Sequence, residues 1–224
     1  MATPLKTDLP ADQRLKINEI FFSLQGESSL VGLPTVFIRL TGCPLRCQYC
    51  DTAYAFHAGN WQTLDDIVAQ VAGFGAKHVC VTGGEPLAQK NCQTLMHRLC
   101  DEGYVVSIET SGAYDISEID PRVIRVMDLK TPDSGELAKN RMENVPVLTG
   151  QDQVKFVLCS ESDYEWAKGI IGEYGLLGRC QVLMSPSFEQ LPAKSLAEWI
   201  LRDKLGVRMQ LQLHKLLWGD TPGH

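Results

Sequence analysis

The sequence predicts an α/β fold: a partial TIM-like barrel of about six parallel strands with its helices outside. Apolar, β-branched stretches alternate with amphipathic helical stretches, which is typical of βαβ units and parallel pairing. Polar or glycine-rich segments follow the strands, as they do at the active-site edge of parallel folds. The 224 residues hold too few such units for an eightfold barrel and show no linker, so residues 1–224 are expected to form one domain.

Each strand is expected from a short apolar run that a turn signal ends. The first run stops at a Gln-Gly turn, the second at Gly42, and the last shows a clean alternation of apolar and polar residues. The expected strands lie within residues 17–28, 34–42, 77–86, 104–112, 123–132, 154–159, 179–187 and 207–214.

The helices are expected from one-sided apolar stripes between these strands. Residues 63–72 place Leu64, Ile67, Val68, Val71 and Ala72 on one face, with Thr63 as the cap. Similar stripes cover residues 92–100, 164–174 and 195–201. Residues 57–62 and 133–150 are expected to be a loop and an irregular segment.

Composition excludes some classes of function. The net charge is -6 and the sequence pI is about 5.4, which argues against a phosphate-binding surface and so against a nucleic-acid substrate. No apolar run reaches the ~20 residues of a membrane span. The first residues lack the apolar core of a signal peptide, so we expect a cytoplasmic protein with reduced cysteines.

Three of the eight cysteines form a motif. Cys43, Cys47 and Cys50 have the spacing C-x3-C-x2-C at the end of an expected strand. Three thiolates can hold three irons of a cubane cluster and leave the fourth iron open. Cys80, Cys92, Cys100, Cys159 and Cys180 lie in strand or helix patterns and are expected to be buried small apolar residues. A different hypothesis is a non-catalytic zinc module that uses His57 as the fourth ligand.

The motif, followed by Gly83-Gly84-Glu85-Pro86 after the next main strand, resembles the radical S-adenosylmethionine (SAM) superfamily. The resemblance implies a 4Fe-4S cluster whose open iron binds SAM and whose electron cleaves SAM to a 5′-deoxyadenosyl radical. The two glycines allow close backbone approach to a ligand. Tyr49, between the last two cysteines, is expected to lie against adenine.

Three segments resemble more narrowly the 7-carboxy-7-deazaguanine synthases: FFSLQGES, RLTGCPLRCQYCDT and LQLHKLLWGDTPG. That family contracts 6-carboxy-5,6,7,8-tetrahydropterin to 7-carboxy-7-deazaguanine with loss of ammonia, on the pathway to queuosine in tRNA and other 7-deazapurines. The resemblance implies catalytic SAM, Mg²⁺, a partial barrel, a homodimer and a reducing partner such as flavodoxin or ferredoxin. A glycyl-radical-enzyme activase shares the cysteine spacing and is the alternative enzyme, although the first and last segments argue against it.

The resemblance also implies roles for particular residues. The carboxamide of Gln25 suits the amide edge of a pterin, and the guanidinium of Arg39 suits a carboxylate. The implied substrate contacts are Leu24, Gln25, Gly26, Arg39, Thr82 and Pro222, so both terminal extensions are expected to reach the substrate.

On the cofactor side, the cysteines hold the cluster and Thr52 is the implied Mg²⁺ ligand. The family often has Ser-Pro-Lys where this chain has Asp128-Leu129-Lys130, so only the lysine keeps the family pattern. The implied SAM contacts are Tyr49, Cys50, Asp51, Gly84, Glu109, Asp128, Leu129, Lys130 and Ser185. The sequence identifies no residue as a proton acceptor.

Overall fold

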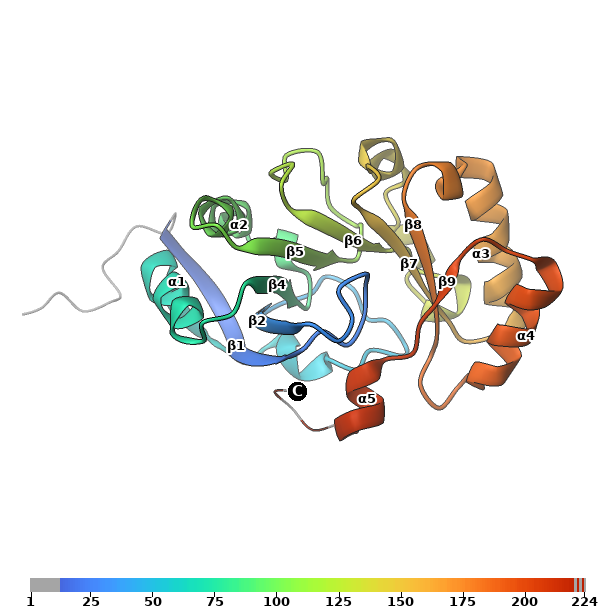
Figure 1. Ribbon diagram of the computed structural model, residues 1–224, viewed down its shortest axis with the longest axis horizontal. Helices are drawn as coiled ribbons and strands as arrows, with labels where there is room; N and C mark the ends of the chain where they lie inside the picture. The colour runs from blue at the N-terminus through green and yellow to red at the C-terminus, as the bar shows by residue number, and fades with distance from the viewer. Residues whose placement is uncertain (1–12, 220, 222, 224) are drawn as a thin grey trace, which may run out of the picture.

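A nine-stranded sheet forms the centre of the computed structural model, which describes residues 13–219, 221 and 223 (Figure 1). Along the sheet the strands follow the order β3-β1-β2-β4-β5-β6-β7-β8-β9. Their bounds are β1 Arg14–Leu24, β2 Pro34–Leu40, β3 Asn60–Thr63, β4 His78–Gly83, β5 Val105–Thr110, β6 Ile124–Asp128, β7 Gln153–Leu158, β8 Gln181–Pro186 and β9 Arg208–Met209.

The sheet confirms the predicted partial barrel. From β2 through β4 to β9 every neighbouring pair is parallel, and the last strand of this run has only two residues. The strands β1 and β3 add an antiparallel edge beside β2. Because β3 and β9 stand at opposite ends of the order, the described sheet curves without closing.

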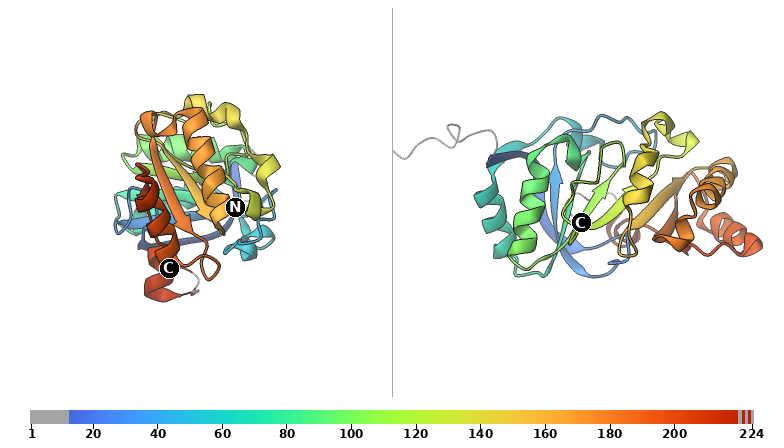
Figure 2. Two further views of the ribbon diagram at one scale, coloured as in Figure 1. Left: turned by 90° about the vertical axis from the view of Figure 1, so that its right-hand side faces the viewer. Right: turned by 90° about the horizontal axis from the view of Figure 1, so that it is seen from above.

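Helices cover the outer face of the sheet, as the two further views show (Figure 2). They are α1 Leu64–Gly73, α2 Asn91–Asp101, α3 Glu161–Tyr174 and α4 Ala193–Asp203. The short α5 Leu213–Trp218 lies apart from them in the C-terminal tail and buries none of its residues (Figure 1). The predicted cap of α1 is confirmed, because the hydroxyl of Thr63 accepts from the amide of Asp66 at 3.0 Å. Ser160 caps α3 in the same way through the amide of Asp163.

The hydrophobic core lies between the sheet and these helices. Ile67 and Val71 of α1 and Leu95 and Leu99 of α2 are fully buried against it. Alternate residues of the parallel strands face this core, and the residues between them face the interior of the barrel. In β7, for instance, Val154, Phe156 and Leu158 belong to the core. This alternation directs the other strand residues toward the site.

Two local predictions were wrong. Residues 60–62, expected in a loop, belong to β3, because Arg14–Ile17 offers an antiparallel partner that a local pattern cannot reveal. Residues 207–214, expected as one strand, pair only at Arg208–Met209. The alternation there reflects glutamines that bind another loop, and Leu213 already begins the unpredicted helix α5.

Burial also corrects some single residues. Ala72 is exposed, while the other four residues of its stripe are buried. Cys80, Cys92 and Cys180 are buried as predicted, but Cys100 and Cys159 are only half-buried. In the ranges that the structure describes, no helix is both long and apolar enough to cross a membrane.

Candidate active site

A cavity of about 580 Å³ opens at the carboxyl ends of the parallel strands and gathers most of the predicted site residues. From the expected cofactor side it is lined by the three motif cysteines, Tyr49, Asp51, Thr52, Gly84, Glu109, Asp128 and Lys130. From the expected substrate side it is lined by Leu24, Gln25, Gly26, Arg39 and Thr82. Leu129 and Ser185 are buried and do not line it, and Pro222 lies outside the described residues.

The cysteine motif forms a loop of residues 41–52 after β2, held by contacts within the loop and by bonds from Arg46 and Gln48 to Glu136 and Ser134. All three cysteines are free and half-buried, and the amide of Cys50 donates to the carbonyl of Cys47 at 3.2 Å. The guanidinium of Arg46 donates to the carbonyl of Cys43 at 2.7 Å and lies 4.3 Å from the ring centre of Phe56. Burial raises the pKa of Cys47 to about 11, and a bound metal lowers such a pKa.

The glycine turn after β4 packs directly against this loop. A Cβ on Gly84 would lie 2.2 Å from the carbonyl oxygen of Gly42 and 2.7 Å from Cβ of Cys43. Gly83 has φ +155, and a Cβ there would lie 2.4 Å from the carbonyl oxygen of Leu40. Both positions therefore need glycine, which brings backbone polar groups next to the cysteines. This arrangement fits a cluster whose open iron holds SAM.

Glu85 fixes this turn to the next strand end. Its buried carboxylate accepts from the hydroxyl of Thr110 at 2.9 Å and from the amide of Ser111 at 2.7 Å. The sequence analysis assigned Glu85 no role beyond its motif. The buried hydrogen bonds of Glu85 therefore hold the turn after β4 against the turn after β5.

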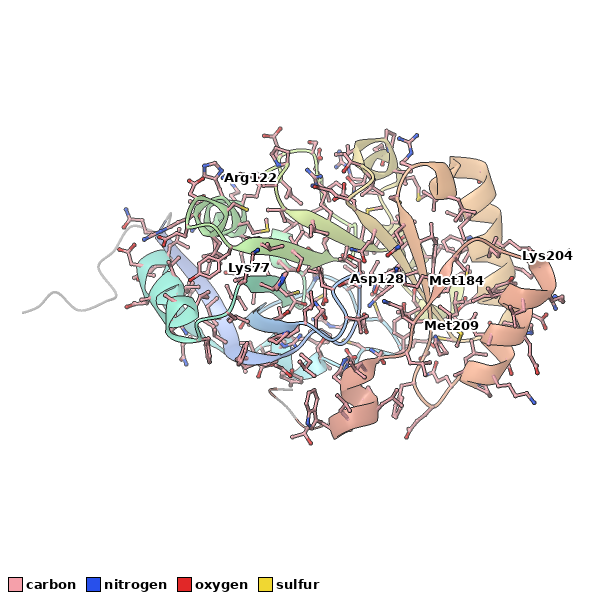
Figure 3. All side chains as sticks on the ribbon, in the orientation of Figure 1. Lys77, Arg122, Asp128, Met184, Lys204 and Met209 are labelled. Carbon is pink, nitrogen blue, oxygen red and sulfur yellow. The ribbon has the colours of Figure 1, made fainter. Side chains whose placement is uncertain are left out.

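Charged and unpartnered polar groups mark the expected SAM side. Lys130 Nζ lies 3.2 Å from Asp128 Oδ1 and 5.6 Å from the ring centre of Tyr49. In Figure 3, Asp128 is labelled at the end of β6. Among the described residues, the hydroxyl of Tyr49, which lines the cavity, is buried and has no hydrogen-bond partner. The hydroxyl of Ser185 is also unpartnered within these residues, but it lies outside the cavity lining. The orphaned donor of Tyr49 fits a polar ligand in this part of the cavity.

The expected substrate side is a polar cluster. The carboxylate of Glu109 accepts from the hydroxyl of Thr82 at 3.0 Å and from the amide of Gln25 at 3.5 Å. Glu109 therefore lies with the expected substrate contacts, although the family resemblance led us to expect it on the SAM side. Arg39 Nε lies 2.7 Å from Glu19, which also accepts from Tyr54, so this guanidinium enters the cavity already oriented.

Three residues at this end of the cavity escaped the sequence analysis: Glu27, Lys155 and Gln212. The amide of Gln212 donates to Glu27 at 2.8 Å and to Asp51 at 3.2 Å, and Lys155 pairs with the other oxygen of Glu27. One signal was available for Lys155. It occupies an inward position of a strand whose neighbours Val154 and Phe156 are apolar, and a charge there is rarely left unpaired.

The start of the C-terminal tail lies over the same turn. The amide of Leu213 donates to the carbonyl of Gly26 at 3.0 Å. A Cβ on Gly26 would meet Nδ1 of His214 at 2.2 Å, so the imidazole packs directly against this glycine. The described part of the tail thus reaches one expected substrate contact.

The zinc hypothesis receives no support from the geometry. Within the described ranges, no three Cys, His, Asp or Glu side chains converge as a site for a single metal ion. One tetrahedral zinc draws its ligands to about 2.3 Å from a common centre. Three thiolates that each bind a different iron of a cubane can stand further apart.

Known proteins are similar to this chain in sequence. The model of the radical SAM superfamily matches residues 37–129. A 7-carboxy-7-deazaguanine synthase of Chlorobaculum tepidum is 47% identical over 207 residues, which cover 91% of this chain and 94% of that protein. A protein of the same name from Koribacter versatilis is 39% identical over 219 residues, which cover 91% of this chain and 97% of its own length.

Solved structures agree with the fold. The crystal structure of QueE from Escherichia coli superposes with a TM-score of 0.75 at 23% identity and covers 90% of this chain and 95% of its own. Streptococcus suis SuiB bound to S-adenosylmethionine gives a TM-score of 0.52 at 16% identity, over 76% of this chain and 45% of that one. At these identities the likeness concerns the partial barrel alone.

Proposed function

The chain belongs to the 7-carboxy-7-deazaguanine synthases of the radical SAM superfamily, and from this we propose that it converts 6-carboxy-5,6,7,8-tetrahydropterin to 7-carboxy-7-deazaguanine with loss of ammonia. It is a radical SAM lyase that uses a 4Fe-4S cluster and SAM. The observation that carries the proposal is the joint placement of three free cysteines, the Gly83-Gly84 turn and a polar substrate cluster around one cavity. The activase alternative has no comparable support.

The cofactors would be held by the loops after β2, β4 and β6. Cys43, Cys47 and Cys50 would ligate the cluster, and the backbone of Gly84 would meet SAM. When bound, the cluster and SAM supply the one-electron chemistry that removes hydrogen from the pterin. Burial lowers the pKa of Lys130, but the nearby carboxylate of Asp128 outweighs this and raises the pKa above its ordinary value. Lys130 therefore stays an ammonium, which suits the carboxylate of SAM.

The substrate would lie between the turn after β1 and the ends of β2, β4 and β5. Gln25, Thr82 and Glu109 offer donors and acceptors to the pterin ring, and Arg39 offers its guanidinium to the carboxylate. These residues orient the reacting carbon and exclude water from it. Leu24 and Gly26 would complete this surface, and we keep Pro222 as a proposed contact.

Mg²⁺ is proposed beside the cluster loop. Thr52 would contribute one hydroxyl oxygen, which is a weak ligand for a hard cation, so oxygens of the substrate must complete the coordination. Thr52 Oγ1 lies 3.9 Å from Cys50 Sγ, next to the cluster ligands. Asp51, which accepts from Gln212, would orient water around the ion or contact SAM.

The remaining proposals concern the protein as a whole. We propose one radical SAM core domain with short substrate-binding extensions at both ends, acting in the cytoplasm as a homodimer. The product would enter 7-deazapurine synthesis, and flavodoxin or ferredoxin would reduce the cluster.

The proposed function is tested with anaerobically reconstituted protein. It is incubated with SAM, dithionite, Mg²⁺ and 6-carboxy-5,6,7,8-tetrahydropterin, and the products are separated by liquid chromatography and mass spectrometry. We expect 7-carboxy-7-deazaguanine and ammonia in equal amounts, with SAM not consumed in proportion. Cleavage of SAM without any deazaguanine would reject the assigned substrate.

A further inference from the structure

One buried cation stands between the two halves of the cavity and has no role in the function proposed above. Lys155 lies on the inward face of β7, and its side chain is 12% exposed. It is the register partner of Asp128 on β6, and the amide of Leu129 donates to its carbonyl at 2.9 Å. Its backbone is therefore fixed beside the strand end that carries the expected SAM contacts.

The ammonium of Lys155 contacts two carboxylates from different elements that line the cavity. It pairs with Glu27 on the turn after β1, and Asp128 Oδ2 lies 3.6 Å from it. Asp128 in turn pairs with Lys130. The result is an alternating row of four charges, Glu27, Lys155, Asp128 and Lys130, and each of these side chains is at most 18% exposed.

Each end of this row reaches a different group of expected ligand contacts. The amide of Glu27 donates to the side-chain oxygen of Gln25 at 3.2 Å, which sets the orientation of that carboxamide. At the other end, Lys130 lies over the ring of Tyr49. Lys155 thus connects to the pterin side through one residue, Glu27, and to the SAM side through one residue, Asp128.

Electrostatics make the middle of the row decisive. Two carboxylates in a poorly solvated cavity repel each other unless a cation stands between them. Gln212 also holds Glu27, but an amide brings no charge to oppose it. Removing the ammonium of Lys155 would leave Glu27 without its ion pair and Asp128 with Lys130 alone. It would therefore displace Glu27, Asp128 or both, while the neighbouring strands stay in place.

We propose that Lys155 is a positioning residue that holds the pterin side and the SAM side of this cavity in register, acting through Glu27 on one and Asp128 on the other. The proposal rests on the proposed function, since that function names the two ligands. Lys155 itself touches neither reacting atom in this scheme. Its substitution acts on how tightly each ligand is held and oriented.

The test divides the effect between the two carboxylates. Reconstituted holoenzyme is prepared as wild type, Lys155→Met, Lys155→Arg, Glu27→Gln and Asp128→Asn. The control is Lys168→Met, because Lys168 also bridges two carboxylates, Glu165 and Asp203, but on the outer helix α3. Equilibrium dialysis without pterin gives the Kd of SAM, and fluorescence titration with 6-carboxypterin, an unreactive analogue, gives the Kd of the pterin.

We expect Lys155→Met to raise both dissociation constants by roughly 10- to 100-fold, the scale on which misplaced contacts act. Glu27→Gln raises only that of the pterin, and Asp128→Asn only that of SAM. Lys155→Arg keeps the charge and restores both to within about threefold, whereas general destabilisation would not be rescued in this way. Lys168→Met changes neither.

The proposal is overturned if Lys155→Met resembles Lys168→Met, or if Glu27→Gln and Asp128→Asn each weaken both ligands equally. Should Lys155→Met not fold, the two dissociation constants of Lys155→Arg, Glu27→Gln and Asp128→Asn test the proposal in the same way. A wild-type protein that binds and cleaves SAM but ignores 6-carboxypterin rejects the proposed function instead. In that case Lys155→Met and Asp128→Asn still show whether Lys155 supports the SAM side.

Discussion

The loop of residues 41–52 and the turn of residues 25–29 both line the cavity, but they are built in different ways. Within the loop Cys50 bonds to Cys47 and Arg46 bonds to Cys43. The backbone amides of Arg46 and Gln48 also donate to Glu136 and Ser134, which follow β6 in the chain. The turn depends on residues 124 to 185 positions away in the chain. Gln153 binds Ser29, and Gln210 binds Ser28. Lys155 and Gln212 both bind Glu27.

This difference follows from the order of the strands. The turn joins β1 and β2 near one end of the open sheet, while its partners come from β7 and from the segment after β9 near the other end. The contacts therefore bridge the gap that an incomplete barrel leaves. The loop of residues 41–52 is held by its own residues, by the turn after β4 and by residues 134–136, which follow β6 in the middle of the sheet. The turn of residues 25–29 needs both ends of the fold.

The largest expected effect concerns the cysteine loop of residues 41–52. Cys47→Ala removes one of three thiolates, and a cluster held by the remaining two is expected to be lost, so product formation should fall to background. Iron and sulfide analysis and the electron paramagnetic resonance spectrum of the reduced protein measure this. Cys100→Ala, at a half-buried cysteine of α2, is the matched control and should keep full iron content. Normal iron in Cys47→Ala would show that the loop is not the cluster site.

A second prediction probes how closely the loop meets its neighbour. Gly84→Ala forces a Cβ to within 2.2 Å of a backbone oxygen, so we expect a loss of about 1–3 kcal/mol and reduced iron content. Gly169→Ala is the control, because nothing lies within 4 Å of its Cβ position in α3. Alanine in mid-helix should stabilise the protein by about 0.5–1 kcal/mol. Urea unfolding measures both; equal effects would contradict the packing of this turn.

The same contrast explains what the sequence could reveal. The cysteine motif, the glycine turn and the helix cap at Thr63 are short-range patterns, and the structure places them as predicted. Glu27 and Lys155 are separated by 128 positions, and nothing near either residue announces the other. The glutamines after β9 were misread as strand residues, because alternation cannot distinguish pairing with a sheet from side chains that reach across to another loop.

A third prediction uses pH to probe the distant contacts. Burial raises the pKa of Glu27, but Lys155 and Gln212 outweigh it and lower the pKa from 4.5 to about 2. A lowered pKa stabilises the folded state above about pH 4.5, and this contribution is lost as the pH falls toward 2. Glu27→Gln should therefore cost on the order of 3 kcal/mol near neutral pH. The difference in the free energy of unfolding between Glu27→Gln and wild type, measured with urea, should become smaller below about pH 4.5. A gap independent of pH would mean that the charge of Glu27 is not what stabilises the turn.

A smaller effect is expected from a neutral contact of the same turn. The buried side chain of Gln210 donates to the carbonyl of Ser28 at 2.6 Å and accepts from its amide at 2.9 Å. Gln210→Ala leaves both backbone groups without these bonds, which should cost about 1–3 kcal/mol. The Kd of 6-carboxypterin should rise more than that of SAM, because Ser28 lies on the substrate turn. Equal weakening of both ligands would argue that the turn supports the whole cavity.

The smallest expected effect comes from an ionic network of similar size outside the cavity. Arg202 of α4 contacts Glu161, Glu165 and Asp203. Arg202 and both glutamates are about half exposed, so water and salt screen them, and Asp203 keeps Lys168 as a second cationic partner. Arg202→Gln should therefore shift the Tm by no more than about 2 °C and leave both ligand affinities unchanged. Calorimetry in low and high salt checks this. If Arg202→Gln lowered the free energy of unfolding as much as Glu27→Gln, burial would not explain the strength of the contacts made by the turn of residues 25–29. Exposed and buried ion pairs would then contribute equally to the stability of this fold.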